Sequence, residues 1–571
     1  MALQENVNDI DVGITARFLK IGMLSLALVG LCVLYFLNQF KGLGTEHAMD
    51  QAQIARSLIS GKGFSTRYIR PLAIRQLSDS GKNIPSGNFP EFYNAPLFPI
   101  VEAAALLPVK NRLQMAPTDL LCMGDRAIAL LGIVLLLLSV FVWYFVGRLL
   151  FDAPLAIIAS GLLLATDLIW QYALSGLPQL FLIFLFGLVT FCSLIAKQAD
   201  EHEETVPTLL WLAAAAFGLG LMSLTHGIAS FLVPGFLVFC LFGFQSRIMA
   251  FVISMVVYLI TVFPWLIHNY SVCGNPFGIS IYMAMAGAGI TENEVMRGVN
   301  IGLSLGAGMA AKFRNGLVDQ AAHLWEYLGL NIIAPAFLLS LLYPFRNPTA
   351  ALWRWTVLLM WGGAAIGMTL FGVKESVSAN QLHLIFLPIF ILYGMAFVLV
   401  LWNRLNINFK PLRTAFLSII FLLAGTPMLL TLLAGPQGRI QWPPYVPVFI
   451  SVFNKWFSPG ELLSSDVPAA VAWYADRKCL LLPETVRQFD EISDFGTLGT
   501  PIVGLYLTPV SAKESFLDLI KGPYKEWGPV IMRTVDLNNF LLKSYTPLPV
   551  DGECLLYADT ERWRAKPKED K

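Results

Sequence analysis

The chain has 571 residues, of which 56% are hydrophobic and only 13% are charged, and its formal net charge is +1. Soluble domains carry about 25% charged residues, so this composition indicates a membrane protein. The near-zero net charge argues against nucleic acid as a partner, because association with nucleic acid needs a basic surface.

The first predicted element is a membrane-spanning helix over residues 21–40. About 20 consecutive apolar residues are needed to cross the hydrocarbon core of a bilayer, and this segment has that length. Arg17 and Lys20 precede it, and no evident small-residue cleavage site follows it. We therefore expect an anchor that stays in the membrane rather than a signal peptide that is removed.

A polar stretch, residues 45–66, follows the first span and is predicted to contain an amphipathic helix that ends at Gly61 and Gly63. At about 100° per residue, its polar side chains share one stripe and its apolar side chains share the opposite one. The polar stripe holds Glu46, Asp50, Gln53 and Ser57, and the apolar stripe holds Ala48, Ala52, Ala55 and Ile59. By itself, the pattern is explained equally well by a juxtamembrane helix with a solvated face and by a helix that carries a functional site.

Two long polar loops, residues 41–120 and 269–326, interrupt a series of further apolar segments. Residues 96–108 of the first loop are apolar but too short to span, so we expect them to re-enter the membrane or to lie on its surface. Ten further spans bring the predicted total to eleven: 121–146, 154–172, 178–196, 208–223, 228–244, 248–268, 327–343, 353–372, 382–401 and 415–433.

The distribution of lysine and arginine predicts which side of the membrane each loop faces. If the N-terminus is cytoplasmic, the cytoplasmic connections hold Arg148, Lys197, Arg247, Arg346, Arg354, Arg404, Lys410 and Arg413. The short connections on the other side hold little positive charge, with Lys374 as the exception. This asymmetry agrees with the positive-inside tendency, and it places both long loops and the tail on the outer face.

The tail, residues 435–571, is predicted to form a small extracytoplasmic α/β domain, distinct from a transmembrane domain over residues 1–434. Its sequence predicts alternating helices and strands, which is typical of an α/β domain. Helices are expected at 465–477 and 511–527, and strands at 478–483, 500–509 and 553–559. The tail has no Gly-rich phosphate loop, no GxSxG stretch and no paired metal-ligand spacing, which favours a packing or acceptor-docking role. Cys479 and Cys554 could pair if the tail faces an oxidising compartment.

Titratable residues of the outer loops supply the candidate chemistry. The first loop holds an acidic patch of Glu46, His47 and Asp50, which is followed by Arg67, Arg70 and Arg75. A carboxylate beside cations at a membrane surface suits a lipid-linked phosphate substrate, because the carboxylate can take a proton from an acceptor hydroxyl while the cations stabilise the departing phosphate. A phosphate leaving group needs no protonation, so one carboxylate suffices, unlike the acid–base pair of ordinary glycoside hydrolysis.

Three stretches carry a resemblance to a known superfamily: D-x4-A-R-x-L-x2-G-x-G-F from Asp50, N-A-P-L-F-P from Asn94, and P-W-L-I-H-N-Y-S-V-C-G-N-P-F from Pro264. In their order and spacing they resemble the GT-C membrane glycosyltransferases, in particular the bacterial branch related to protein O-mannosyltransferases and the lipid A aminoarabinose transferase. The resemblance covers about residues 18–433, with a family-like tail. It implies transfer of a sugar from a polyprenyl-phosphate donor to a lipid, glycan or protein acceptor at the outer face of a bacterial inner membrane.

The resemblance also implies roles for individual residues. Asp50 is the first choice for the catalytic base and Glu46 the second, and His47 occupies the usual place of the acid. Arg67, Arg70, Arg75 and Lys374 would bind the donor phosphate, and Tyr93, Asn94, Pro96, His268 and Asn269 would line the substrate pocket. Three positions depart from the family pattern: Asn94 to Pro96 replace a frequent His-Pro-Pro, His268 replaces an arginine, and Pro178 with Gln179 replace an acid.

Two other functions are compatible with the sequence: a polytopic transporter or flippase, and a non-catalytic protein that keeps the GT-C scaffold. Transporters usually contain internal repeats and charged or broken helices at the midplane, and no convincing repeat is found in this sequence. A divalent cation is left open, because one acid pair without a clear ligand set does not indicate a tightly held ion.

Overall fold

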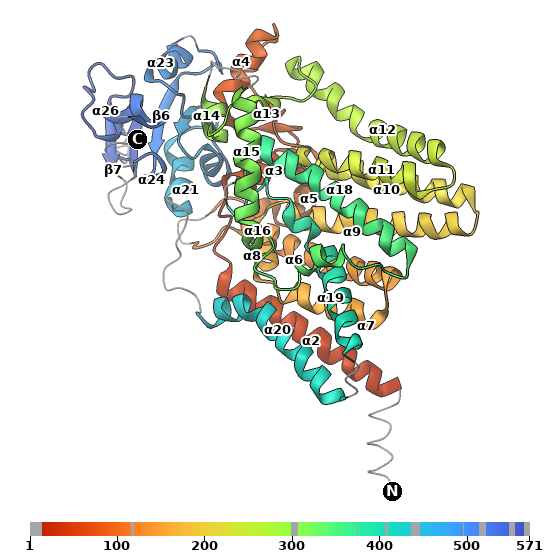
Figure 1. Cartoon of the computed structure of the whole chain (residues 1–571). Coiled ribbons are helices and arrows are strands. Elements are labelled where there is room, and N and C mark those ends of the chain that lie inside the picture. Colours follow the sequence, from red (N-terminus) through yellow and green to blue (C-terminus); the bar gives the residue numbers. More distant parts are fainter. Residues whose placement is uncertain are drawn as a thin grey trace.

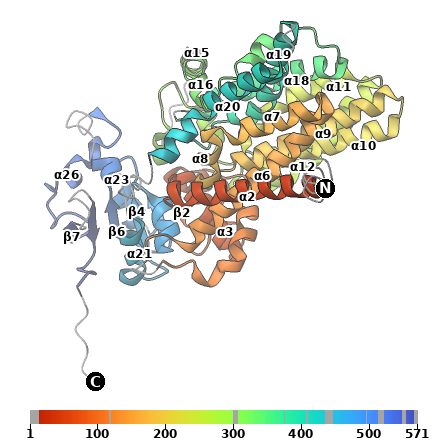
Figure 2. The ribbon, with the colours of Figure 1, turned by 90° about the horizontal axis from the view of Figure 1, so that it is seen from below.

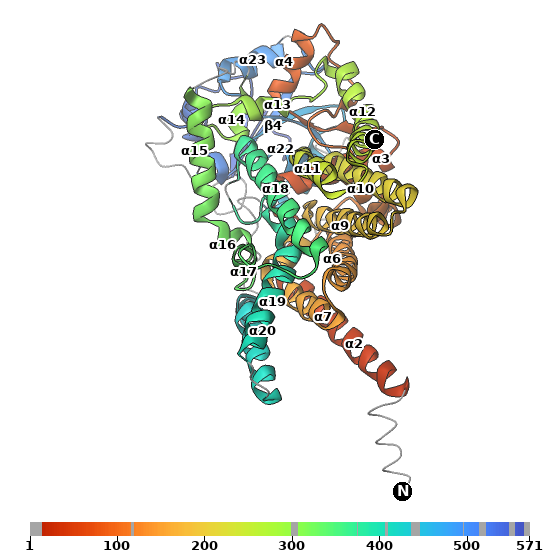
Figure 3. The same ribbon diagram turned by 45° about the vertical axis from the view of Figure 1, so that its right-hand side comes forward.

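The computed structural model describes residues 14–115, 119–298, 307–373, 375–405, 409–434, 446–494, 496–512, 521–547 and 554–564. Its helices form an elongated bundle, and a β-sheet with short helices around it lies at one end of that bundle (Figure 1). Helices α2 (Ile14–Gln39) and α20 (Lys410–Leu433) leave the bundle at the end opposite the sheet (Figure 3).

Within the described residues, seven helices are long and apolar enough to cross a membrane. An eighth span results if α7 (Ala153–Leu164) and α8 (Asp167–Ser175), which meet at a bend of 62°, count as one. The seven are α2, α6 (Met123–Leu150), α9 (Gln179–Glu201), α10 (Thr205–Thr225), α12 (Arg247–Cys273), α19 (Leu387–Arg404) preceded by the 3-10 turn η3 (His383–Phe386), and α20. The chain is therefore a mostly helical integral membrane protein, with fewer apolar spans than the eleven predicted.

Three of the eleven predicted spans are not among these eight. Residues 228–244 are divided between the 3-10 turn η2 (Gly227–Leu232) and the short helix α11 (Val233–Gly243), and residues 353–372 lie in the less apolar α18 (Pro348–Phe371). Residues 327–343 do not form a single helix. The side-chain oxygen of Asn331 accepts the N–H of Ile333 (3.0 Å) and of Ala334 (3.3 Å), and these bonds replace helical ones.

Helix α3 (Glu46–Ile59) lies in the polar stretch after the first span. It begins after Thr45, whose hydroxyl accepts the N–H of Ala48 (3.3 Å), and it ends just before Gly61, as its sequence predicts. Residues 48–57 are all buried, because the helix packs between α5 (Leu97–Leu106) and two short helical segments of the tail, α22 (Pro468–Ala470) and η4 (Val471–Ala475). The interpretation of α3 as a juxtamembrane helix with a solvated face is therefore wrong.

The other elements of the two long loops are short. They are β1 (Ser65–Thr66), β2 (Tyr68–Ile69), α4 (Pro71–Asp79), β3 (Phe89–Pro90), α5, the 3-10 turn η1 (Leu107–Arg112), α13 (Ile281–Met285), α14 (Glu292–Arg297), α15 (Ala307–Ala322) and α16 (Leu324–Tyr327); α17 (Ala336–Ser340) follows. α5 occupies most of the apolar segment that was expected to be too short to span.

The tail contains strands and short helices in alternation. Its elements are α21 (Pro447–Trp456), β4 (Leu462–Ser465), α22 (Pro468–Ala470), the π-helical turn η4 (Val471–Ala475), β5 (Lys478–Leu481), α23 (Val486–Asp494), β6 (Ile502–Leu507), α24 (Pro509–Ala512), η5 (Lys525–Trp527), α26 (Gly528–Ile531), β7 (Ser544–Pro547) and β8 (Leu555–Ala558). Residues 435–445 and 513–520 lie outside the described residues. The first stretch contains the expected domain boundary, and the second contains much of the helix expected at 511–527.

The sheet of the tail takes its first strand from the first long loop. The six strands lie in the order β2-β5-β4-β6-β8-β7. The first four are mutually parallel, and β8 runs antiparallel to both of its neighbours, β6 and β7. Figure 2 shows β2 in line with the tail strands and close to α3. The first loop and the tail therefore fold as one unit, although almost the whole transmembrane region separates them in sequence.

Cys479 and Cys554 do not pair, and none of the seven cysteines, all of them described, forms a disulfide. Cys479 lies on β5 and Cys554 directly precedes β8, and the strands β4 and β6 separate them in the sheet. Neighbouring strands lie about 4.8 Å apart, so this placement is too distant for a disulfide.

Candidate functional site

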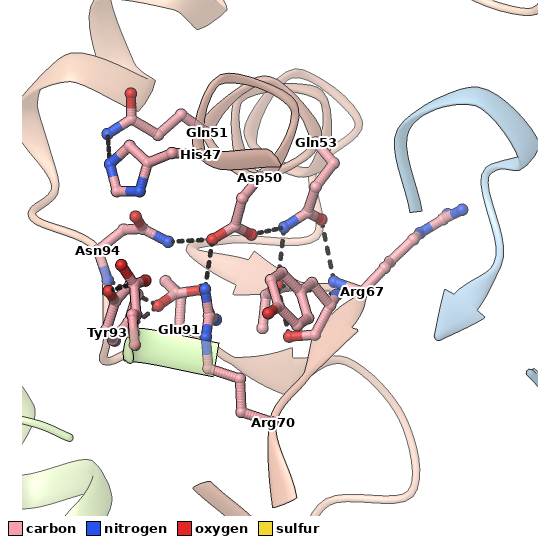
Figure 4. Close-up of polar contacts among 12 residues, drawn as sticks. His47, Asp50, Gln51, Gln53, Arg67, Arg70, Glu91, Tyr93 and Asn94 are labelled. Atoms are coloured by element: carbon pink, nitrogen blue, oxygen red, sulfur yellow. Dashed lines mark hydrogen bonds and ion pairs between the residues drawn. The ribbon is translucent and has the colours of Figure 1, made fainter. Parts of the chain in front are cut away.

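The side chain of Asp50 is the centre of a buried polar cluster on α3. It is 1% exposed, and its two carboxylate oxygens accept three hydrogen bonds. Oδ2 accepts from Arg70 Nη2 (2.7 Å) and from Asn94 Nδ2 (2.6 Å), and Oδ1 accepts from Gln53 Nε2 (3.0 Å) (Figure 4). Three donors around one carboxylate stabilise its ionised form.

Arg70 supplies the positive charge of this cluster. It follows β2 directly and is 4% exposed. Its guanidinium lies between the rings of Tyr68 and Tyr93, at 3.9 and 4.1 Å from the ring centroids, and its Nη1 is 4.0 Å from Glu91 Oε2. The two aromatic faces and the two carboxylates hold the guanidinium in one orientation.

A tight turn after β3 places Asn94 against Asp50. Glu91 Oε1 accepts the backbone N–H of Tyr93 (2.6 Å) and of Asn94 (2.8 Å), and this pair of bonds closes the turn. Burial, reinforced by the charge of Asp50, raises the pKa of Glu91. Pro96 then caps α5, so the N-A-P-L-F-P stretch serves to aim the Asn94 amide at the carboxylate.

Glu46 and His47 lie one helical turn before Asp50. Burial, with the negative charges of Asp466, Glu292 and Asp50 nearby, raises the pKa of Glu46 to about 8. His47 Nε2 lies 3.1 Å from Gln51 Nε2, and its ring lies 6.2 Å from that of His226. Burial lowers the pKa of His47, so its imidazole is neutral at pH 7.

Of the three predicted phosphate-binding arginines, all of which the structure describes, Arg70 alone pairs with Asp50. Arg67 forms an ion pair with Asp476 of the tail. Arg75 pairs with Asp79 at 3.0 Å, four residues along α4; the Arg75 side chain is 36% exposed and that of Asp79 is 62% exposed. Lys374 lies outside the described residues.

The predicted pocket residues at the end of α12 make local contacts. His268 stacks on Trp265, with ring centroids 5.0 Å apart. Asn269 is buried, and its Nδ2 donates to the carbonyl of Pro276 (3.2 Å). The following loop reaches the turn that carries Asn94, because the N–H of Ile279 donates to the carbonyl of Phe92.

Several residues of the cluster were not expected from the sequence. Glu292 of α14 accepts a hydrogen bond from the Tyr93 hydroxyl, and Asp466 at the end of β4 adds negative charge near Glu46. Glu91 could have been found from the sequence, because an acid within an otherwise apolar stretch indicates a buried polar contact. Glu292 and Asp466 gave no such indication, because their approach depends on chain segments far apart in sequence.

Within the described residues, no group of three or more histidine, cysteine, aspartate or glutamate side chains is placed to hold a metal ion.

The sequence matches no protein-family model and no curated protein. The structure resembles that of ArnT from Cupriavidus metallidurans bound to undecaprenyl phosphate, with a TM-score of 0.55 and 11% identity over 96% of this chain and 99% of that one. It also resembles the oligosaccharyltransferase AglB from Archaeoglobus fulgidus in complex with an inhibitory peptide and a dolichol-phosphate, with a TM-score of 0.54 and 13% identity over 96% of this chain and 75% of that one. Both are GT-C membrane glycosyltransferases, so the predicted resemblance is confirmed at the level of the fold.

Proposed function

We propose that this chain, which has the GT-C fold, is an inverting glycosyltransferase that moves a sugar from a polyprenyl-phosphate donor to a lipid, glycan or protein acceptor. The observation that carries the proposal is the buried Asp50 carboxylate, held by Arg70 and two amides on the first loop after the first span. The solved ArnT and AglB structures hold undecaprenyl phosphate and dolichol-phosphate, and this supports a polyprenyl phosphate as the lipid partner.

In the proposed reaction, Asp50 is the general base. It takes the proton from an acceptor hydroxyl while the hydroxyl oxygen forms a bond to the anomeric carbon of the sugar. The bond between that carbon and the phosphate oxygen breaks, and its electron pair leaves with the phosphate. The new bond forms on the face opposite the leaving group, so the anomeric configuration inverts.

We favour Asp50 over Glu46 as the base. A pKa of about 8 leaves most Glu46 protonated at pH 7, and a protonated carboxyl group donates a proton rather than accepting one. Asp50 instead forms an ion pair with Arg70 and accepts hydrogen bonds from Asn94 and Gln53. This difference in surroundings supports the choice between two acids that the sequence leaves open.

We assign the donor phosphate to Arg70. Its guanidinium is fixed by two rings and presents a positive charge beside the base, which stabilises charge that develops on a departing phosphate. Arg67 is engaged by Asp476, and Arg75 projects toward solvent with Asp79, so their positions support this role less well. Lys374 lies outside the described residues and stays a predicted phosphate-binding residue.

We further propose a bacterial inner-membrane location with the N-terminus in the cytoplasm. This orientation puts the Asp50 cluster and the sheet on the outer face, where the lysine and arginine distribution of the connecting loops predicts them to be.

The proposal is tested with purified protein, a set of undecaprenyl-phosphate hexoses and pentoses, and a membrane extract as the acceptor source. Release of undecaprenyl phosphate is measured. Asp50→Asn is expected to lower the rate by about 100-fold or more, which is the usual contribution of a general base. Glu46→Gln should keep most of the activity, and Asp79→Asn, an exposed acid of the same loop, serves as the matched control.

Wild-type activity in Asp50→Asn, Glu46→Gln and the double variant would refute the catalytic role. Substrate flux across liposomes without chemical turnover would instead support a transporter or flippase. Binding of undecaprenyl phosphate without any turnover would support a non-catalytic protein on the GT-C scaffold.

A further inference from the structure

The segment that carries Arg70 is held by the tail. β2 pairs in parallel with β5, with Tyr68 opposite Cys479 and Ile69 opposite Leu480. The N–H of Cys479 donates to the carbonyl of Arg67 (2.8 Å), so the pairing begins just before β2. Two residues are too few to hold a strand without such a partner.

An ion cluster reinforces this pairing at one end of β5. Asp476 pairs with Arg56 of α3 (2.8 Å) and with Arg67, which precedes β2. Arg56 Nη1 also donates to the carbonyl of Trp473 in the π-helical turn (2.7 Å). Asp476 therefore joins three segments: α3, which carries Asp50; the approach to β2, which carries Arg70; and the tail.

A second set of bonds ties the opposite side of Arg70 to the other end of β5. The buried side chain of Arg297 in α14 donates to the carbonyls of Leu482 (2.8 Å) and Pro483 (3.2 Å), just after β5 ends. The same helix begins with Glu292, which accepts from the hydroxyl of Tyr93. Tyr93 is one of the two rings that enclose the Arg70 guanidinium.

Both aromatic walls of Arg70 thus depend on one short stretch of the tail. Tyr68 is held through β2 at the first part of β5, and Tyr93 is held through α14 at its end. Gln53 completes the frame from the α3 side, because its Oε1 accepts the N–H of Arg67 (2.9 Å) while its Nε2 donates to Asp50.

We propose that residues 476–483 of the tail are a positioning element of the site: by holding Tyr68 and Tyr93, they set where the Arg70 guanidinium lies between Asp50 and a donor phosphate. Asp476 is the positioning residue of this element. The tail is then a part of the site in its own right, rather than a packing or acceptor-docking module. The role in phosphate binding rests on the proposed function.

The test is Asp476→Asn in the full-length protein. Asn is suited to this position because Asp476 has a left-handed backbone (φ 56°), which asparagine also adopts readily. Asp559→Asn is the matched control within the tail, far along the chain from β5. It removes one of the two carboxylate partners of Arg562, at 2.7 Å, and leaves Glu461, at 3.0 Å. Arg297→Gln is the second variant, and it acts on the Tyr93 side.

Three quantities are measured for each protein: affinity for undecaprenyl phosphate, amide hydrogen exchange of residues 66–70 and of residues 50–58, and melting temperature. We expect Asp476→Asn and Arg297→Gln to weaken undecaprenyl phosphate binding at least about tenfold, because small displacements of a binding group have large effects. In Asp476→Asn, exchange should become faster at 66–70 and stay slow at 50–58. Asp559→Asn should match the wild type in binding and in exchange.

Unchanged affinity and unchanged exchange in Asp476→Asn would overturn the positioning role. An equal loss in Asp559→Asn would also overturn it, because the effect would then reflect general weakening of the tail. Absence of undecaprenyl phosphate binding in the wild type would refute the proposed function alone, and the exchange comparison would still decide whether the tail positions Arg70. If Asp476→Asn does not fold, Arg297→Gln decides the question by the same measurements.

Discussion

Removal of the Arg70 charge should be far more damaging than removal of the charge of Arg75, its neighbour on the same loop. Arg70→Gln leaves the Asp50 carboxylate buried at 1% exposure with only amide donors in place of a cation. Loss of one partner from a buried ion pair costs about 3–5 kcal/mol, because the other charge stays desolvated. Loss of the cation between the Tyr68 and Tyr93 rings adds to that cost.

Arg75→Gln is the matched control, since it removes the same charge from an exposed pair with Asp79. Exposed pairs four residues apart on a helix contribute about 0.3–0.5 kcal/mol, so its melting temperature should be close to that of the wild type. Both variants are compared by scanning fluorimetry of purified protein in one detergent. The sequence alone gives the same role to these two arginines, whereas in the structure Arg70 is buried beside Asp50 and Arg75 lies beside Asp79.

A double-variant cycle isolates the Arg70–Asp50 interaction. Arg70→Gln combined with Asp50→Asn removes both buried charges, so the double variant should be more stable than the sum of the single effects predicts, by roughly 1–3 kcal/mol. Equal melting temperatures for Arg70→Gln and Arg75→Gln, or strictly additive effects in the cycle, would refute the geometry on which the site is built.

Two further predictions concern the acids around the site. The pKa of Glu46 is about 8 in the folded protein and 4.5 in the unfolded chain, so the folded state binds more protons between these values and its stability falls as pH rises from about 4.5 to about 8. In Glu46→Gln, the melting temperature should depend less on pH over that range. An unchanged pH dependence would contradict the raised pKa. The Asp125 carboxylate accepts hydrogen bonds from Trp473 Nε1 (2.7 Å) and from the Tyr474 hydroxyl (3.0 Å), both in the tail. Asp125→Asn weakens these bonds, so limited proteolysis should cut the tail faster than in the wild type. Equal cleavage rates would exclude a role for Asp125 in holding the tail against the helices.

The local features of α3 could be predicted from the sequence, whereas its surroundings could not. Thr45 and Gly61 indicate where the helix begins and ends, because both act through short-range chemistry. The spacing of its alanines indicates the apolar side of the helix. The burial of its polar stripe depends on Arg70 and Asn94, which reach Asp50 from other segments. A stripe of polar side chains looks the same in sequence whether water or protein partners satisfy it.

The difference among the three arginines also depends on long-range structure. They occur within nine residues of sequence, and no local pattern distinguishes them. They have different partners because β2 pairs with β5, which places Arg67 beside Asp476 and Arg70 between Tyr68 and Tyr93. A two-residue strand whose partner lies in the tail gives no periodic signal, so the shared sheet could not be foreseen.

The charge balance of the site leads to Asp50 without reference to any motif. Among the described residues, Glu46, Glu91 and Glu102 lie near Asp50, which pairs with Arg70, and so many ionised carboxylates could not share one buried region. Burial and mutual repulsion raise the pKa of Glu46 and of Glu91, which favours their neutral forms. Asp50 receives the guanidinium and two amides, so the negative charge of the site is concentrated there. An anionic donor phosphate beside Arg70 would favour the neutral forms of Glu46 and Glu91 still further, and Asp50 would remain the base available to an acceptor hydroxyl.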